Sequence, residues 1–357
     1  MSIYYIAGIY IINVFLALFG VIMKPKIKAW ILVIQAVLFS CLYGYRDISI
    51  GADTRNYVSL YNGHYGAEWG FKKLGEICHY IFGDGNYAYK YFLFAVCLFM
   101  TLNFAYFYYV MCKNNVSSEG MHYINFIYLA MFCMPYVISM SINVIRQGIA
   151  ISLFLLGLAL YKKRKKKRAW LAILFAPTFH KSIFIIEAMY FLVGRIRNRK
   201  KRILFTSIFS MFCILVSRTG MVFWILTKLP LQKVVRTLMG YSHDSSSIGF
   251  SAKLLFYWCC VLVCSVALYF YNMGESYEII HKLISAILLV TTMLSFSELT
   301  ASRFIINMDC ILPLVFGLIY IKIRPKELFL FLYAMAFAGI LLITLKSNAF
   351  ASQLGLI

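Results

Sequence analysis

The chain has 357 residues, of which 62% are hydrophobic, 18% aromatic and only 13% charged, with a formal net charge of +22 at pH 7. A soluble domain carries about a quarter charged residues, so this composition excludes an ordinary water-soluble fold. The apolar runs are long and continuous rather than short and alternating, which favours membrane-spanning helices over a membrane β-barrel.

Ten apolar runs are long enough to cross the hydrocarbon core as helices. In chain order they are 3–23, 29–45, 89–111, 121–140, 143–161, 203–217, 254–273, 282–298, 303–321 and 327–345. The sequence therefore predicts an all-α polytopic membrane protein of about ten transmembrane helices. We expect residues 1–357 to form a single integral membrane domain.

An eleventh apolar stretch, 169–194, is unusual because a basic cluster lies at each of its ends, Lys162–Arg168 and Arg195–Arg202. The positive-inside rule places both clusters in the cytoplasm. A broken, re-entrant helical hairpin with its tip near Pro177–Ser182 satisfies that rule, and Pro177 favours a break there. The alternative is one long tilted helix.

Two loops on the predicted outer side are long, 46–88 and 218–252. In the first, apolar residues from Phe71 to Phe82 recur at helical spacing, and in the second Leu231, Val234 and Leu238 do the same. Both patterns predict amphipathic helices at the membrane interface.

Ten cysteines are scattered mostly through apolar runs, without the spacing of a zinc site, so we expect neither metal nor another cofactor. The basic runs accompany no soluble aromatic-rich module. They therefore indicate contact with the lipid bilayer rather than with nucleic acid.

Polar residues that are expensive at membrane depth gather at the predicted outer ends of the helices, which makes them candidates for function. They are Arg46, Asp47, Asp53, Arg55, Tyr57, Glu68, Arg146, Gln147, His180 and Arg303.

Several of these residues lie in segments that resemble one family. Residues 46–57, RDISIGADTRNY, resemble the R-D-x-x-x-G-x-D-T-x-x-Y element of EpsG-type, Wzy-like polysaccharide polymerases. That family also shows a glutamate followed by Gly-Phe and Leu, an I-R-Q-x-[IL]-A element, an F-H-x-S element and a late arginine before an aromatic residue. The matching residues here, in that order, are Glu68, Gly70, Phe71 and Leu74 (with Trp69 inserted), residues 145–150, then Phe179, His180 and Ser182, and finally Arg303 and Phe304.

The resemblance implies a glycosyltransferase of the bacterial inner membrane, with its active site at the periplasmic or outer face. The donor would be a glycan on undecaprenyl pyrophosphate, and the acceptor a repeat unit on the same carrier. The product would be O-antigen of lipopolysaccharide, capsule or exopolysaccharide. A chain-length regulator and a flippase of the same pathway are the implied protein partners.

This reaction releases a lipid pyrophosphate, so fixed cations in a poorly hydrated site would stabilise the transition state. Arginine suits that role because its planar fork pairs with two phosphate oxygens. We assign Arg146 and Arg303 to the pyrophosphate, with Arg46 or Arg55 as a third contact. We expect no metal ion in the reaction, because the sequence has no Asp-x-Asp pair.

The attacking sugar hydroxyl needs a base, for which His180, Asp53 and Glu68 are the candidates. The carboxylates are alternatively ligands for sugar hydroxyls or partners that hold the arginines. Asp47, Tyr57 and Gln147 complete the predicted substrate-binding set.

Two other functions remain open at this point. A flippase or transporter for lipid-linked sugars would also use a broken helix and arginines facing a cavity. A ligase that moves finished glycan to a different acceptor would share nearly every residue discussed above.

Overall fold

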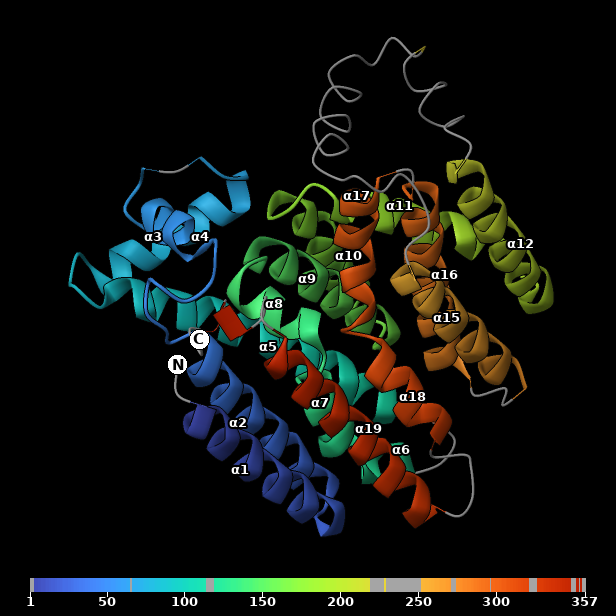
Figure 1. Cartoon of the computed structure of the whole chain (residues 1–357), viewed down its shortest axis with the longest axis horizontal. Coiled ribbons are helices and arrows are strands. Elements are labelled where there is room, and N and C mark those ends of the chain that lie inside the picture. Colours follow the sequence, from blue (N-terminus) through green and yellow to red (C-terminus); the bar gives the residue numbers. More distant parts are fainter. Residues whose placement is uncertain are drawn as a thin grey trace. The chain divides into compact units, whose positions relative to one another are not determined.

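In the part of the chain that the computed structural model describes, all regular secondary structure is helical (Figure 1). Lipid offers no partners for backbone polar groups, and helices satisfy those groups internally. The predicted all-α fold is therefore confirmed. The described residues are 3–64, 66–113, 119–218, 228, 252–270, 274–295, 297–320, 326–347, 351, 352 and 354.

The contacts divide the chain into two compact units. The first unit comprises Met1–Phe184 and Leu312–Ile357, and the second comprises Ile185–Ile311. That the two units act as one membrane domain stays a prediction.

Each of the ten expected runs contains helix, and among the described residues six segments are long and apolar enough to cross a membrane. They are α1 (Ile3–Ile22), α2 (Pro25–Tyr43), α5 (Ala88–Lys113), α9 (Ile145–Lys162), α16 (Glu275–Met293) and Thr300–Tyr320, which covers most of α17 (Glu298–Ile305) together with η2 (Ile306–Met308) and α18 (Leu312–Tyr320). Shorter apolar stretches lie in α15 (Ala252–Phe270) and α19 (Lys326–Lys346). The helix α12 (Arg199–Arg218) covers the run 203–217 and begins with four basic residues. The chain is thus a multi-pass membrane protein, and ten spans stay a prediction.

The run 121–140, expected as one span, is broken into α7 (Ile124–Met131) and α8 (Pro135–Ile142), which meet at 66°. Pro135 lacks a backbone N–H and would clash with the preceding turn of a continuous helix. Helix α7 therefore ends before this proline, and α8 begins at it. Counting the bent pair as one span gives seven. The bend directs α8 toward the start of α9.

Two glycines on α9 allow neighbouring helices to pack closely against it. A Cβ atom on Gly148 would lie 2.5 Å from the sulfur of Met100 on α5, and one on Gly157 would lie 2.5 Å from Ile173. Ile173 belongs to α10 (Lys166–Phe175), which packs along α9 after a short turn. The absence of a side chain at both positions lets three helices approach one another tightly.

The helical structure is interrupted after α10, at the position where the tip of a hairpin was predicted. Pro177 lies in the short 3₁₀-helix η1 (Ala176–Thr178), and α11 (Ile183–Arg195) begins after four further residues. Helix α10 has 10 residues and α11 has 13, so each is shorter than the roughly 20 residues of a full span. The break is therefore confirmed, and the re-entrant path stays a prediction.

The segment 46–88, predicted as an outer loop, contains α3 (Thr54–Tyr61) and α4 (Trp69–Phe82) (Figure 1). Helix α4 is amphipathic as predicted: Phe71 is fully buried against the rings of Tyr57 and Phe92, whereas Ile77 and Ile81 are exposed. The helix predicted in the second loop, 218–252, lies outside the described residues.

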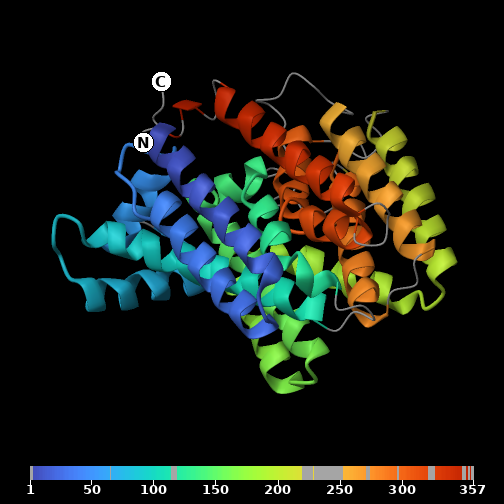
Figure 2. The same ribbon diagram turned by 90° about the horizontal axis from the view of Figure 1, so that it is seen from below.

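Within the second unit, α12 and α15 lie side by side (Figure 2), and the indole of Trp258 donates to Ser210 across 2.8 Å. The carboxylate of Asp309, which follows η2, is completely buried and accepts a hydrogen bond of 2.6 Å from Tyr257. This pairing satisfies an acid that would otherwise be costly inside an apolar helix bundle.

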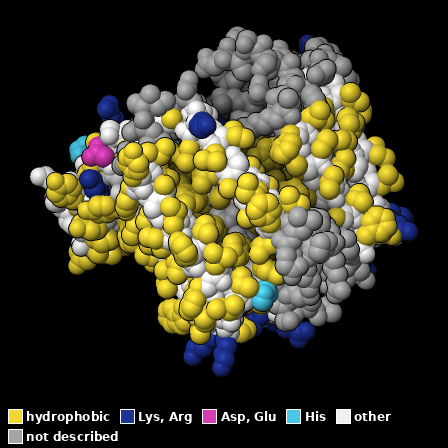
Figure 3. Space-filling model, turned by 60° about the horizontal axis from the view of Figure 1, so that its bottom comes forward, with side chains coloured by type: hydrophobic (Ala, Val, Ile, Leu, Met, Phe, Trp, Pro, Cys, Tyr) yellow, Lys and Arg dark blue, Asp and Glu magenta, His cyan; other side chains and the backbone are white. Residues whose placement is uncertain are grey.

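Hydrophobic side chains cover most of the face drawn in Figure 3, and basic side chains lie mainly at its margins. Exposed apolar patches larger than a few hundred Å² are rare on soluble proteins. This surface therefore suits a hydrocarbon environment, with the charges kept toward water.

Candidate functional site

Three of the predicted site residues, from distant parts of the chain, meet in the first unit. Arg146 donates from Nη1 to Oε2 of Glu68 across 2.6 Å. The other carboxylate oxygen, Oε1, lies 3.3 Å from Nδ1 of His180. The side chains of Glu68, Arg146 and His180 are 15%, 29% and 26% exposed, so the cluster is reachable but poorly hydrated. We call these residues the Glu68 trio.

Each member of the trio stands where a helix begins or breaks. Glu68 is the residue before α4, Arg146 lies in the first turn of α9, and His180 follows η1. Helix α10 runs back along α9, so η1 reaches the first turn of α9 and also contacts α4. The tight α9–α10 hairpin thus carries His180 to Arg146.

The electrostatics keep Glu68 ionised. Partial burial alone would raise the pKa of Glu68, but the hydrogen bond with His180 and the charge of Arg146 outweigh it and lower that pKa to about 2. The start of α9 adds the positive end of a helix dipole beside Arg146. Such a position favours an anionic ligand.

Gly70 brings α4 against η1. A Cβ atom at this position would lie 2.4 Å from the hydroxyl oxygen of Thr178 and 3.0 Å from its carbonyl oxygen. Any larger residue therefore pushes apart the elements that carry Glu68 and His180.

We expect Gly70→Ala to lower any activity that depends on the Glu68 trio by roughly 10- to 100-fold, because a displacement of about 1 Å is enough to disturb the geometry of a catalytic site. The measurement is product formation per amount of purified, monodisperse protein. Gly66→Ala is the matched control, because a Cβ atom there meets nothing within 4 Å. Equal activity of the Gly70 variant and the unmodified protein would contradict this role.

Arg46 has a different environment from the trio. It is only 2% exposed, and its guanidinium donates to the carbonyl oxygens of Tyr43 (2.6 Å), Ser141 (3.0 Å) and Ile142 (2.7 Å). These carbonyls lie at the C-terminal ends of α2 and α8, where backbone acceptors are unpaired and the helix dipole is negative. Arg46 therefore joins two helix ends, and direct contact with substrate stays a prediction.

The rest of the segment 46–57 packs onto the junction between α8 and α9. The hydroxyl of Tyr57 donates to the backbone carbonyl of Asn143, and the side-chain oxygen of Asn143 accepts from the N–H of Ala52 across 2.8 Å. Gly51 has a φ of +86°, and a Cβ atom there would lie 2.4 Å from Ile142. The segment thus folds a rigid loop beside the trio.

The other predicted residues of the first unit lie around this loop. Asp53 precedes α3 and is half-buried, and Arg55 is exposed on that helix. Burial raises the pKa of Tyr57, and Asp53 and Arg146 also act on it with opposite signs, so both charges lie near its ring. Gln147 is buried.

Asp47 is exposed at the edge of the same loop and lies 3.9 Å from Lys90 on α5. The ammonium group of Lys90 also faces three tyrosine rings, with the centroid of Tyr87 at 5.0 Å. Lys90 was not among the predicted site residues.

Arg303 belongs to the second unit, where it is exposed in the last turn of α17. Its role together with the Glu68 trio stays a prediction.

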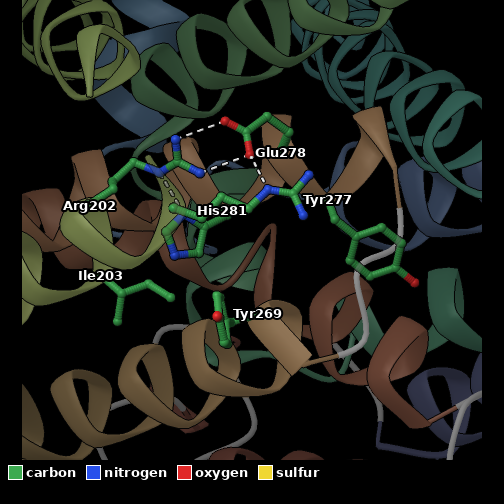
Figure 4. A pocket seen from close by; sticks show the side chains of 7 residues that line it. Arg202, Ile203, Tyr269, Tyr277, Glu278 and His281 are labelled. Atoms are coloured by element: carbon green, nitrogen blue, oxygen red, sulfur yellow. Dashed lines mark hydrogen bonds and ion pairs between the residues drawn. The ribbon is translucent and has the colours of Figure 1, made fainter. Parts of the chain in front are cut away.

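The second unit contains a charge cluster that the sequence analysis missed (Figure 4). Arg202 is completely buried and pairs with both carboxylate oxygens of Glu278 at 2.8 Å, and its Nε donates to His281 across 3.0 Å. Arg199 and Lys282 also contact Glu278, at 3.2 Å each. In the sequence, the basic run that contains Arg202 indicated only membrane topology. The signal that could have revealed the cluster is the spacing of Glu278 and His281, which places both residues on one face of α16. We interpret this cluster as a link between α12 and α16.

Comparison with known proteins supports the family assignment. The family model described as "EpsG family" matches residues 29–355, which include every motif that carries the resemblance. No curated protein and no solved structure matched the chain. Because the matched region covers nearly the whole chain, the protein belongs to the EpsG family, a family of Wzy-like polymerases.

Proposed function

We propose that this protein is a polysaccharide polymerase, a membrane glycosyltransferase that uses undecaprenyl-pyrophosphate-linked glycan as its donor. It transfers the growing glycan onto the non-reducing sugar of a lipid-linked repeat unit at the outer face of the bacterial inner membrane. The observation that carries this proposal is the Glu68 trio, in which an arginine and a histidine share one carboxylate within an EpsG-family chain.

His180 is the proposed general base. A hydrogen bond from Nδ1–H to Glu68 selects the tautomer whose Nε2 accepts a proton, as in other histidine–carboxylate pairs. The acceptor hydroxyl oxygen attacks the anomeric carbon of the donor sugar as its proton moves to Nε2. The bond between that carbon and the pyrophosphate oxygen breaks, and both bonding electrons leave with the pyrophosphate.

Arg146 is the proposed pyrophosphate ligand. Its guanidinium and the N-terminal end of α9 both present positive charge where the leaving group gains negative charge. Glu68 holds the guanidinium of Arg146 and the imidazole of His180 together. Of the roles that the sequence left open for the carboxylates, this is the one in which a carboxylate positions an arginine. Asp53 is proposed as a ligand for sugar hydroxyls. The proposed reaction uses no metal ion.

The test uses purified protein in nanodiscs, supplied only with the lipid-pyrophosphate-linked repeat unit of its own host. We expect a ladder of longer glycans, release of lipid pyrophosphate, and an unchanged ladder in the presence of EDTA. No ladder, together with movement of the lipid-linked unit between leaflets of vesicles, would replace the polymerase with a flippase. Transfer only to a different, added acceptor would indicate a ligase.

A further inference from the structure

An exposed aromatic surface lies directly beside the Glu68 trio. Trp69 follows Glu68 in the chain and is 59% exposed. Its ring meets that of Phe175 edge to face, with centroids 6.2 Å apart and an angle of 85°. Phe175 is itself 44% exposed and packs in the same manner on Phe179, at 5.3 Å. Phe179 is buried and immediately precedes His180, so the aromatic line runs from the neighbour of Glu68 to the neighbour of His180.

The contact with Phe175 braces the indole without covering it. A tryptophan side chain combines a large apolar face with few rotatable bonds, so a braced and exposed indole provides a pre-organised apolar surface. The apolar C–H face of a pyranose ring is a matching surface, because its hydroxyl groups point outward and remain hydrated during stacking.

Both charged and apolar side chains lie near this surface. Lys72, on the turn of α4 that begins at Trp69, and Lys181, which follows His180, are exposed. Leu171 and Leu174, on the helix α10 that ends at Phe175, are exposed as well. Such a mixture is typical of the membrane interface, where a sugar attached to a membrane lipid would lie.

We propose that Trp69, braced by Phe175, is a sugar-binding subsite that stacks on a pyranose ring of the acceptor repeat unit. The acceptor is assigned rather than the donor because the aromatic line ends at His180, the proposed base for the acceptor hydroxyl. This proposal rests on the polymerase function proposed above.

The competing explanation is that Trp69 merely anchors α4 at the membrane interface. Tyr80 provides a matched control, because it lies about three helical turns further along α4, on nearly the same side, and is 91% exposed. An anchoring role predicts equal effects at both positions, whereas a subsite predicts an effect at Trp69 alone.

The experiment compares Trp69→Ala, Trp69→Phe and Tyr80→Ala in nanodiscs. Polymerisation kinetics use the host's lipid-pyrophosphate-linked repeat unit. Binding of the lipid-free oligosaccharide of that unit is measured by saturation-transfer NMR. Because the oligosaccharide has no lipid, its binding does not depend on membrane anchoring.

We expect Trp69→Ala to raise KM roughly 5- to 10-fold, to leave kcat within about twofold, and to weaken oligosaccharide binding similarly. Trp69→Phe should recover most of the affinity, and Tyr80→Ala should match the unmodified protein. Equal losses in the two alanine variants would overturn the subsite in favour of anchoring.

Failure of this proposal is distinguishable from failure of the polymerase function. Polymer from the unmodified protein together with unchanged KM in Trp69→Ala would reject the subsite and retain the polymerase. Absence of polymer with tryptophan-dependent oligosaccharide binding would reject the polymerase and retain a sugar site. Absence of both would reject the subsite.

Discussion

Polymer formation by Arg146→Ala is expected to fall about 100- to 1,000-fold, as when one donor to a developing oxyanion is removed from an enzyme. The loss should appear mainly in kcat, because the charge on the pyrophosphate increases in the transition state. Arg146→Lys should recover little, because an ammonium group lacks the planar fork of guanidinium. The measurement is the initial rate of ladder formation from the lipid-linked repeat unit.

Glu68 provides the companion test, because it contacts both Arg146 and His180. Glu68→Gln should also reduce the rate strongly, and the double variant Glu68→Gln/Arg146→Ala should lose less than the product of the two single losses, because Arg146→Ala already removes one of the two contacts of Glu68. Lys73→Ala is the control, because Lys73 also lies on α4 and forms an ion pair, but its partner is Glu76 and both side chains are about half exposed. Fully additive losses in the double variant would show that the two residues act independently.

Replacement of Arg46 should affect folding more than chemistry. Arg46→Ala removes a buried charge that pairs with carbonyl groups of two helix ends and leaves those groups without their donor. A buried acceptor left without its donor costs about 1–3 kcal/mol, so the loss of several should lower the melting temperature by roughly 10 °C. The measurement is the thermal melting of the protein in detergent, followed by size-exclusion chromatography.

Arg55→Ala is the matched control for stability, because the Arg55 side chain is exposed on α3. We expect its melting temperature to equal that of the unmodified protein. Arg46→Lys should remain destabilised, since an ammonium group does not span the carbonyls of α2 and α8 as a guanidinium does. An unchanged melting temperature in Arg46→Ala would show that the contacts between the helix ends are not needed for the fold.

These two arginines also illustrate the limits of sequence patterns. Arg46 and Arg55 lie in one motif and were predicted to serve the same purpose. The structure buries Arg46 to 2% exposure between α2 and α8 and leaves Arg55 on the surface of α3. Motif membership identified both residues, but it did not distinguish a residue buried between two helix ends from one that is exposed to the surface.

The sequence by itself determined the class of the fold. Long apolar runs require helices in lipid, and Pro177 accounts for the break between α10 and α11 at its predicted position. The break at Pro135 follows the same local rule but was not predicted, because the run 121–140 is apolar on both sides of the proline. Family motifs then indicated which polar residues to examine.

Only the tertiary structure decided which of these residues meet. Glu68 is 78 residues from Arg146 and 112 from His180 along the chain, and no local pattern pairs them. They come together because Gly157 permits close packing of α10 on α9 and Gly70 permits contact between α4 and η1. Helical periodicity describes neighbours within a few residues, whereas contacts between helices depend on how their surfaces fit, and that fit is settled when the whole bundle packs.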